Sequence, residues 1–240
     1  MLLSAFHVST PTLVYKHWLN GALNHLYNQP TSNIEAAAYL NYLQAQAEAF
    51  VFDRFLGANE PKSYLDMLFR DAKLKRKKPI AIDTIDVTRL RYGNIENNFV
   101  FNYLDYLLWC DSGARQTDKK TINEFEFTFR SSVEHFYPQH PMDGFEPLKG
   151  ESADSLDTFG NLCLISHSKN AKLSNLPPSS KQTHFEAGFK KHKIDSLKLY
   201  EMIELLKDRG QWEKPEIQHH EEMMLDILLG IQGRESNGRH

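Results

Sequence analysis

Cysteine is scarce in this chain of 240 residues, which contains only Cys110 and Cys163. The two do not form a C-x-x-C pair, which argues against a disulfide framework and a cysteine-rich structural zinc site. No apolar run approaches the roughly 20 residues that a transmembrane helix needs. The N-terminus also lacks the basic start and long apolar block of a signal peptide. These absences predict a cytoplasmic protein with no membrane partner.

Net positive charge is also lacking, since the formal charge is −3. The basic residues are nevertheless unevenly placed. Residues 70–78 contain six Lys or Arg and one Asp, and residues 166–193 contain six lysines and one acidic residue, Glu186. Local positive potential attracts a phosphate backbone even when the whole molecule is acidic. Lysine-rich runs are also common on solvated surfaces, and for residues 70–78 taken alone we favour that interpretation.

Helical periodicity dominates the first half of the chain and predicts a helical region over residues 1–115. The expected helices are one after Ser9-Thr10-Pro11 that includes Leu13, Val14, Trp18, Leu19, Leu23 and Leu26, then Asn33–Phe55, Lys62–Arg70 and Glu96–Trp109. Ser32 and Glu35 have the spacing of a capping box for the second of these, and Gly57 is its expected stop. Residues 111–121 are polar and predict a linker.

After residue 121 the spacing of apolar residues changes from a helical period to alternation. Phe125, Phe127 and Phe129 alternate with polar residues, which predicts a half-buried strand that continues through Val133. Residues 138–158 predict a long loop. The expected elements after that loop are a strand at Leu162–Ile165, a short helix over Lys169–Asn175 and two closing helices, Ser196–Asp208 with Asp195 as its cap and Gly210 as its stop, and Lys214–Leu229.

Residues with complementary chemistry cluster around these strands. Glu134 and His135 end the first strand, Asn161 precedes the second, and Asn170 follows Asn161 by nine residues. Phosphodiester hydrolysis needs a base for the attacking water and a cation to neutralise the phosphate and the leaving oxygen. Histidine titrates near neutrality, and carboxylate and amide oxygens suit Mg²⁺. The pattern predicts a site with one divalent metal.

Each residue also has a simpler explanation. A Glu-His pair can lie at the surface, Asn161 after Gly160 can be a turn residue, and Asn170 can cap the short helix, with His167 or Ser168 as rivals. We favour the composite site because all its parts occur in order within 42 residues. Surface positions are expected for His140, His184, His192, His219 and His220, and packing roles for Trp212, Ile217 and Met224.

The spacing resembles the ββα-metal (His-Asn-His, HNH) nucleases, and most closely the C-terminal nuclease domain of GmrSD-type modification-dependent restriction endonucleases. The resemblance implies that Glu134 and Asn170 bind the metal, that His135 is the general base and that Asn161 supports it. Many HNH enzymes have histidine at the position of Asn170. Lys172 and Asn175 match motif positions that touch phosphate or brace the helix. The expected DNA-binding residues are Lys169, Asn175, Lys181, Lys190 and Lys191.

The resemblance further implies an α+β fold, mostly helical with a small ββα-metal finger. The expected parts are a helical region over residues 1–115, the finger over 122–193, C-terminal helices over 194–232 that pack on it, and a flexible tail over 233–240. The implied activity is DNA cleavage with Mg²⁺ or Mn²⁺ in restriction or defence. The alternatives are a catalytically silent nucleic-acid-binding or regulatory module, and a helical interaction protein with no nucleic-acid role.

Two partners besides DNA follow from the resemblance. GmrSD-like proteins usually carry a nucleotide-binding ParB-like domain with a motif near D-G-Q-Q-R, and this sequence contains neither that motif nor a P-loop. The chain is therefore expected to be a fragment, a truncated product or a subunit of an NTP-dependent system. A single finger cuts one strand, so cleavage of both strands would require a homodimer or two encounters.

Overall fold

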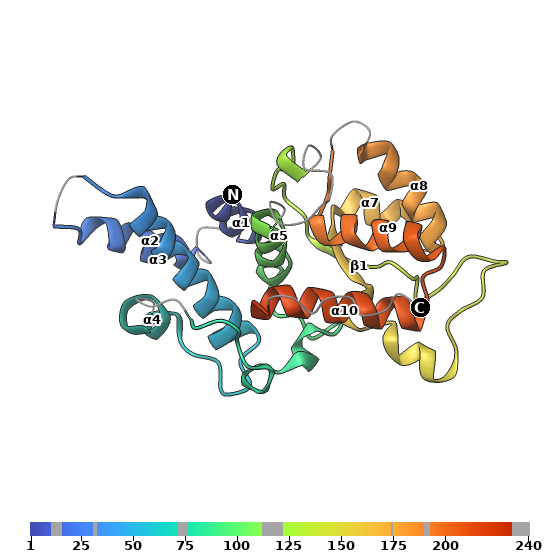
Figure 1. Cartoon of the computed structure of the whole chain (residues 1–240), viewed down its shortest axis with the longest axis horizontal. Coiled ribbons are helices and arrows are strands. Elements are labelled where there is room, and N and C mark those ends of the chain that lie inside the picture. Colours follow the sequence, from blue (N-terminus) through green and yellow to red (C-terminus); the bar gives the residue numbers. More distant parts are fainter. Residues whose placement is uncertain are drawn as a thin grey trace.

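The structure is a computed structural model that describes residues 1–10, 16–30, 33–71, 76–111, 122–173, 175–189 and 193–231. Helices dominate these residues, and their only sheet is a two-stranded antiparallel one (Figure 1). The predicted α+β class with mostly helical content is confirmed. None of the described helices is long and apolar enough to span a membrane.

The N-terminal part is built from helices and helical turns. They are α1 (Leu2–Ser9), α2 (His17–Tyr27), α3 (Ala36–Ala49), the π-helix η2 (Phe50–Phe55), α4 (Tyr64–Asp66), the π-turn η3 (Met67–Asp71), the 3-10 turns η4 (Ile82–Thr84) and η5 (Val87–Leu90), and α5 (Phe99–Asp111). Helix α1 was not predicted from the sequence. The helix expected over residues 33–55 forms from Ala36 onward, with Glu35 at its N-cap. The proposed cap Ser32 lies outside the described residues.

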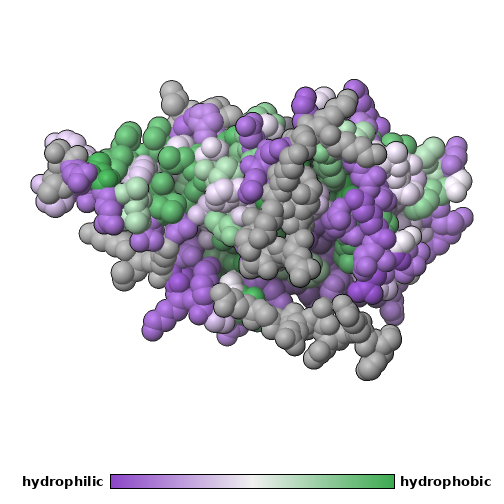
Figure 2. Space-filling view, turned by 45° about the horizontal axis from the view of Figure 1, so that its top comes forward, coloured by the Kyte–Doolittle hydropathy of each residue, from purple (hydrophilic) through white to green (hydrophobic). Residues whose placement is uncertain are grey.

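Apolar side chains are exposed on these N-terminal helices, and Figure 2 shows hydrophobic residues at the surface of this part of the molecule. The exposed large residues there include Leu3, Leu23 and Leu40. Buried residues of the same helices form one apolar core together with α5.

The strand–loop–strand–helix order predicted for the middle of the chain is confirmed. Strand β1 (Ser132–His135) pairs with β2 (Leu162–Ile165), and α7 (His167–Leu173) follows. Glu134 lies opposite Cys163 in the register, and His135 lies opposite Leu162. The loop between the strands contains two 3-10 turns, η6 (Gly150–Ser155) and η7 (Phe159–Asn161).

The start that the alternating phenylalanines predicted for the first strand is wrong. Residues 125–131 are not part of a strand, and β1 begins only at Ser132. Phe129 is 57% exposed, whereas Arg130 is buried. The guanidinium of Arg130 donates to Asp105 Oδ2 at 3.0 Å and lies 5.8 Å from the ring centre of Phe125. Arg130 therefore replaces the expected phenylalanine as the inward-facing residue, because its charge has a buried partner on α5.

Three helices complete the described chain: α8 (Pro178–Phe189), α9 (Leu197–Arg209) and α10 (Lys214–Leu229). Helix α8 was missed, because Pro178 was expected to end a helix and instead occupies the first position of a new one. Ser196, not Asp195, caps α9, since its hydroxyl accepts from the Leu199 N–H. Gly210, with φ of 72°, ends α9 as expected. Helix α10 packs against α5, α9 and η7 (Figure 1).

Candidate active site

A pocket of about 190 Å³ lies where β1 ends. It is lined by Tyr92, Val133, Glu134, His135, Gln139, His140, Asn170 and Asn175. Four residues that the sequence singled out therefore share one cavity, although Glu134 and His135 are adjacent in the chain. Both lie in the regular part of β1, which ends at His135, and the backbone bends at the next two residues.

His135 is nearly buried, and its ring has partners on two sides. Its Nε2 lies 2.9 Å from Asp157 Oδ1, and the ring centre of Tyr92 lies 4.3 Å from that of the imidazole. Burial lowers the pKa of His135, whereas the Asp157 carboxylate opposes that shift. A carboxylate only accepts hydrogen bonds, so Nε2 carries the proton of the neutral ring and Nδ1 has the free lone pair. His135 is thus poised to accept a proton at Nδ1.

Asp157 is the site residue that the sequence analysis missed. Besides His135, the Gln139 amide donates to the same carboxylate oxygen at 2.9 Å, and the Tyr92 N–H donates to the Asp157 backbone oxygen at 2.9 Å. Asp157 lies in the loop expected over residues 138–158, which contains several acidic residues. Nothing in the sequence distinguishes it from its neighbours Glu151 and Asp154. Only the folded loop places it beside the histidine.

Glu134 is paired with Lys181, a residue of α8 that the sequence analysis placed on a DNA-binding surface. Lys181 is only 1% exposed, and its ammonium lies 2.6 Å from Glu134 Oε1 and also donates to the His135 backbone oxygen. The expected DNA contact is therefore corrected to an internal ion pair. Burial raises the pKa of the Glu134 carboxyl, and Lys181 opposes that shift. Lys181 does not line the pocket, and its ion pair fixes the position of the Glu134 carboxylate.

Asn161 does not line the pocket but fixes the loop that follows His135. Its Oδ1 accepts from the Tyr137 N–H at 2.8 Å and from the Trp212 indole at 3.1 Å. Its Nδ2 donates to the backbone oxygens of Tyr137 at 3.0 Å and Leu156 at 2.9 Å. The fully buried amide therefore joins the end of β1 to the segment just before Asp157. Asn161 also ends the turn η7, and its expected support of His135 stays a prediction.

Asn170 contributes an amide oxygen to the pocket. Its Oδ1 is buried and has no hydrogen-bond partner among the described residues. An unpaired buried acceptor is costly unless a ligand or water satisfies it. Amide and carboxylate oxygens are the donors that Mg²⁺ and Mn²⁺ accept, so Asn170 and Glu134 fit such an ion. The described residues contain no cluster of three or more His, Cys, Asp or Glu that could hold a metal ion.

The other predicted basic residues are distributed differently. Lys169 forms an ion pair with Asp195, and its ammonium lies over the Phe185 ring. Lys172 is exposed on α7, and Asn175 is exposed at the pocket edge. Lys190 and Lys191 lie outside the described residues.

The basic run at residues 70–78 is described only in part, because residues 72–75 lie outside the described structure. Arg76 pairs with Asp53, and Lys78 Nζ lies 3.4 Å from Glu48 Oε1. Both cations also lie near the Phe52 ring. These two charges are neutralised within the N-terminal helices.

Polar side chains of α9 and α10 form hydrogen bonds with backbone oxygens at η7 and the start of β2. The Lys198 ammonium donates to the backbone oxygens of Phe159 and Leu162, both at 2.7 Å, and His220 Nδ1 lies 2.7 Å from the Gly160 oxygen. His220 was expected at the surface but is fully buried, because it is the hydrogen-bond partner of this turn. The packing roles expected for Trp212, Ile217 and Met224 agree with their burial.

One family matches the sequence. It is described as GmrSD restriction endonucleases, C-terminal domain, and the match covers residues 82–227, more than half of the chain. It includes the pocket, η7 and nearly all of α10, whereas helices α1 to α4 precede it. No curated protein and no solved structure matches the chain.

Proposed function

The chain belongs to the family of GmrSD restriction endonuclease C-terminal domains, and from that premise we propose that it is a metal-dependent endonuclease of the HNH type. A restriction endonuclease domain acts on DNA, so the substrate bond is a phosphodiester. The observation that carries the proposal is the single pocket that gathers Glu134, His135 and Asn170. Base and hard oxygen donors are the groups that such hydrolysis requires.

His135 is the proposed general base. Its Nδ1 accepts a proton from the attacking water, while Asp157 accepts the Nε2–H hydrogen bond and stabilises the cation that forms. Burial lowers the pKa of the ring, which favours the neutral form that can accept a proton. Asn161 supports the base through the backbone at Tyr137, which fixes where the end of β1 points.

Glu134 and Asn170 are the proposed ligands of one Mg²⁺ or Mn²⁺. When bound, that ion supplies Lewis-acid stabilisation of the phosphate and the leaving 3′ oxygen. Lys181 keeps Glu134 oriented from the buried side. Lys172, exposed on α7 two residues after Asn170, is proposed to contact a DNA phosphate, together with Asn175. The expected products have 5′-phosphate and 3′-hydroxyl ends. Lys169, Lys190 and Lys191 remain proposed contacts to DNA phosphates.

The test is nicking of supercoiled plasmid by the full chain with Mg²⁺, Mn²⁺ or EDTA. His135→Ala should lower the nicking rate by at least about 100-fold, because general-base catalysis contributes roughly 10²–10⁴-fold. His184→Ala is the matched control, since that histidine is exposed on α8 and does not line the pocket. Both variants should melt like the parent chain. Full activity in His135→Ala would refute the mechanism.

One observation favours a second candidate, a catalytically silent DNA-binding or regulatory module. The Glu134 carboxylate already has a buried ammonium partner in Lys181, which competes with a metal ion for it. A silent site would bind DNA but no Mn²⁺, whereas the active site binds both. Mn²⁺ titration followed by electron paramagnetic resonance distinguishes them, with Asn170→Ala as the variant expected to lose the ion.

We further propose that cleavage of both strands takes two copies, and that a ParB-like nucleotide-binding partner controls the intact system.

A further inference from the structure

A second and larger pocket lies beside the candidate active site. Its volume is about 460 Å³, and it is lined by Val87, Thr88, Arg91, Thr158, Gln218, Glu221, Glu222 and Leu225. We call it the Arg91–Glu221 pocket. The size falls within the roughly 300–1,000 Å³ of small-ligand sites. None of its residues belongs to the proposed catalytic set.

The two pockets share a wall. Arg91 lines the second pocket, and the next residue, Tyr92, lines the first and packs on His135. Similarly, Thr158 lines the second pocket, and the preceding residue, Asp157, bonds to His135. The two segments are joined by the hydrogen bond from the Tyr92 N–H to the Asp157 oxygen. A DNA strand with its scissile phosphate at His135 therefore has its neighbouring nucleotides next to this pocket.

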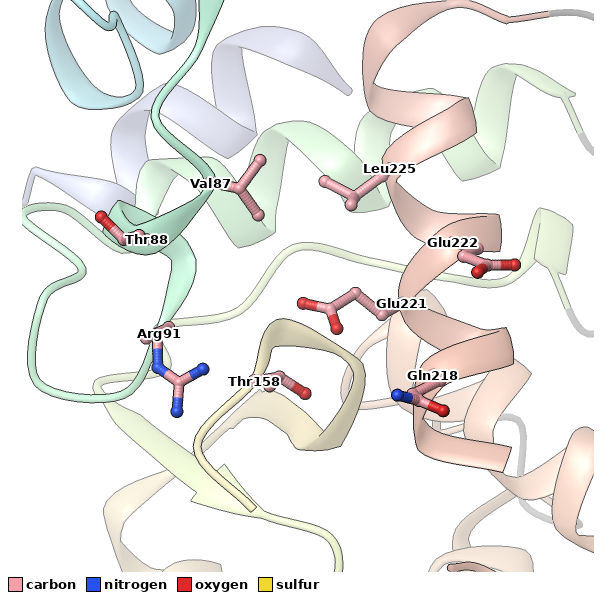
Figure 3. A pocket seen from close by; sticks show the side chains of 8 residues that line it. All are labelled: Val87, Thr88, Arg91, Thr158, Gln218, Glu221, Glu222 and Leu225. Carbon is pink, nitrogen blue, oxygen red and sulfur yellow. The ribbon is translucent and has the colours of Figure 1, made fainter. Parts of the chain in front are cut away.

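The side chains of the pocket combine apolar surface with the Arg91 guanidinium and several acceptors. The acceptors are the carboxylates of Glu221 and Glu222, the Gln218 amide and the hydroxyls of Thr88 and Thr158. Figure 3 shows Val87 and Leu225 facing each other at one end, while Arg91 and Glu221 point toward the same space from opposite sides. The Glu221 carboxylate is held in place, because the Phe159 N–H donates to its Oε1 at 3.2 Å. Arg91 is held at its rim, since its guanidinium donates to the Asp154 backbone oxygen at 3.2 Å.

This combination matches the chemistry of a nucleobase. A base has two apolar faces and an edge that carries both donors and acceptors. Arginine donates to ring nitrogen and carbonyl acceptors, and a carboxylate accepts from an exocyclic amino group. Adenine, cytosine and guanine offer both kinds of partner, whereas thymine has no amino group. A base that reaches such a pocket must leave the stack, which single-stranded or locally opened DNA permits most easily.

We propose that the Arg91–Glu221 pocket binds one nucleobase with an exocyclic amino group, from a nucleotide next to the phosphodiester at His135. The Arg91–Glu221 pocket would then determine which sequences are cut, while the residues of the candidate active site cleave the phosphodiester. The proposal rests on the proposed nuclease function for the path of the DNA, but base binding itself requires no cleavage.

The test uses single-stranded oligonucleotides that carry 2-aminopurine, a fluorescent base with an exocyclic amino group, at one position each. They are titrated with the full chain in EDTA, so that no cut can occur. We expect fluorescence to change at a defined position as the base leaves the stack. Arg91→Met and Glu221→Gln should each weaken the affinity measured from that fluorescence change by about tenfold. This is the effect of losing one hydrogen-bonded base contact. Glu221→Gln retains an oxygen for the Phe159 N–H.

Asp83→Asn is the control for charge, because it removes the same charge as Glu221→Gln from an exposed residue outside both pockets. It should leave the response unchanged. An equal response at every position, or a response that survives both pocket variants, overturns the proposal. A fluorescence response at one position, with no nicking in any metal, supports the base-binding pocket and refutes the nuclease function. Nicking without such a response supports the nuclease function and refutes the base-binding pocket. Where plasmid is nicked, mapped cut sites should show thymine depleted at one fixed offset, and Glu221→Gln should abolish that bias.

Discussion

The N-terminal helices and the segment that carries the candidate site are stabilised by different contacts. In the first, Phe6 of α1 stacks on Phe99 with ring centres 4.5 Å apart and on Trp18 at 5.2 Å. In the second, buried polar groups converge on η7, where Asn161 alone takes part in four side-chain hydrogen bonds. The first region mostly precedes the family match, and the second lies inside it.

The difference shows what each kind of contact can specify. Apolar rings favour burial and good packing but allow small shifts, because dispersion is weakly directional. Hydrogen bonds fix particular atoms, because their strength falls steeply with angle and distance. Directional hydrogen bonds are therefore needed to hold Asp157 at 2.9 Å from the His135 ring. We therefore expect damage to η7 to impair chemistry, and damage to the aromatic core to impair stability alone.

The largest effect is expected from Gly160→Ala. A Cβ atom there would lie 2.1 Å from the Ile217 backbone oxygen on α10, so η7 and α10 would have to separate. We expect a loss of more than about 5 kcal/mol in the free energy of unfolding, which is exceptional for a single substitution. Gly21→Ala is the comparison, since its new Cβ would meet only side chains, which can move. Urea denaturation of both variants measures the difference, and equal losses would argue against a rigid contact.

Phe6→Ala and Asn161→Ala compare the two regions directly. Phe6→Ala should cost about 3–5 kcal/mol in stability, as for other buried aromatic residues. At a temperature where the variant is folded, its nicking rate should equal that of the parent chain. Asn161→Ala should cost about 2–3 kcal/mol, because buried backbone groups lose their partners. It should also slow nicking by folded protein, and normal nicking would remove the supporting role of Asn161.

Asp157→Asn should lower the nicking rate by roughly 10–100-fold, since orienting partners of reactive groups typically contribute this much. The Asp157 carboxylate raises the pKa of His135 against the effect of burial. Without that charge the pKa falls further, so the acidic limb of the rate profile should move to lower pH. Nicking rates between pH 5 and 8 measure the shift. Asp154→Asn, at a nearby exposed residue, should leave the limb in place.

The smallest effect concerns Lys198, whose pKa burial lowers to about 7. Between this value and the ordinary lysine pKa, the unfolded chain binds more protons than the folded one. The Lys198 contribution to stability therefore increases with pH above about 7, by up to about 1.4 kcal/mol per pH unit. Denaturation of the parent chain and Lys198→Met at pH 7, 8 and 9 should give a smaller rise for the variant. Parallel curves would contradict the lowered pKa.

Local sequence patterns predicted α3, α5, β2, α9 and α10 because periodicity and caps are short-range properties. They failed at residues 125–130, where the alternation of phenylalanines suggested a strand. A strand needs a partner, and the buried partner of Arg130 is Asp105, which is 25 residues away in the sequence. They also missed α8, because a proline can end one helix and begin another.

The sequence by itself determined the residue types of the candidate site and their order, from Glu134 and His135 through Asn161 to Asn170. It also determined the strand–loop–strand–helix frame, since both follow from motifs within one short segment. The tertiary structure alone decided that Asp157 is the partner of His135, that Lys181 is an internal ion pair and that the Arg91–Glu221 pocket adjoins the site. These depend on segments far apart in the chain, and on which charges lose their water when the segments meet.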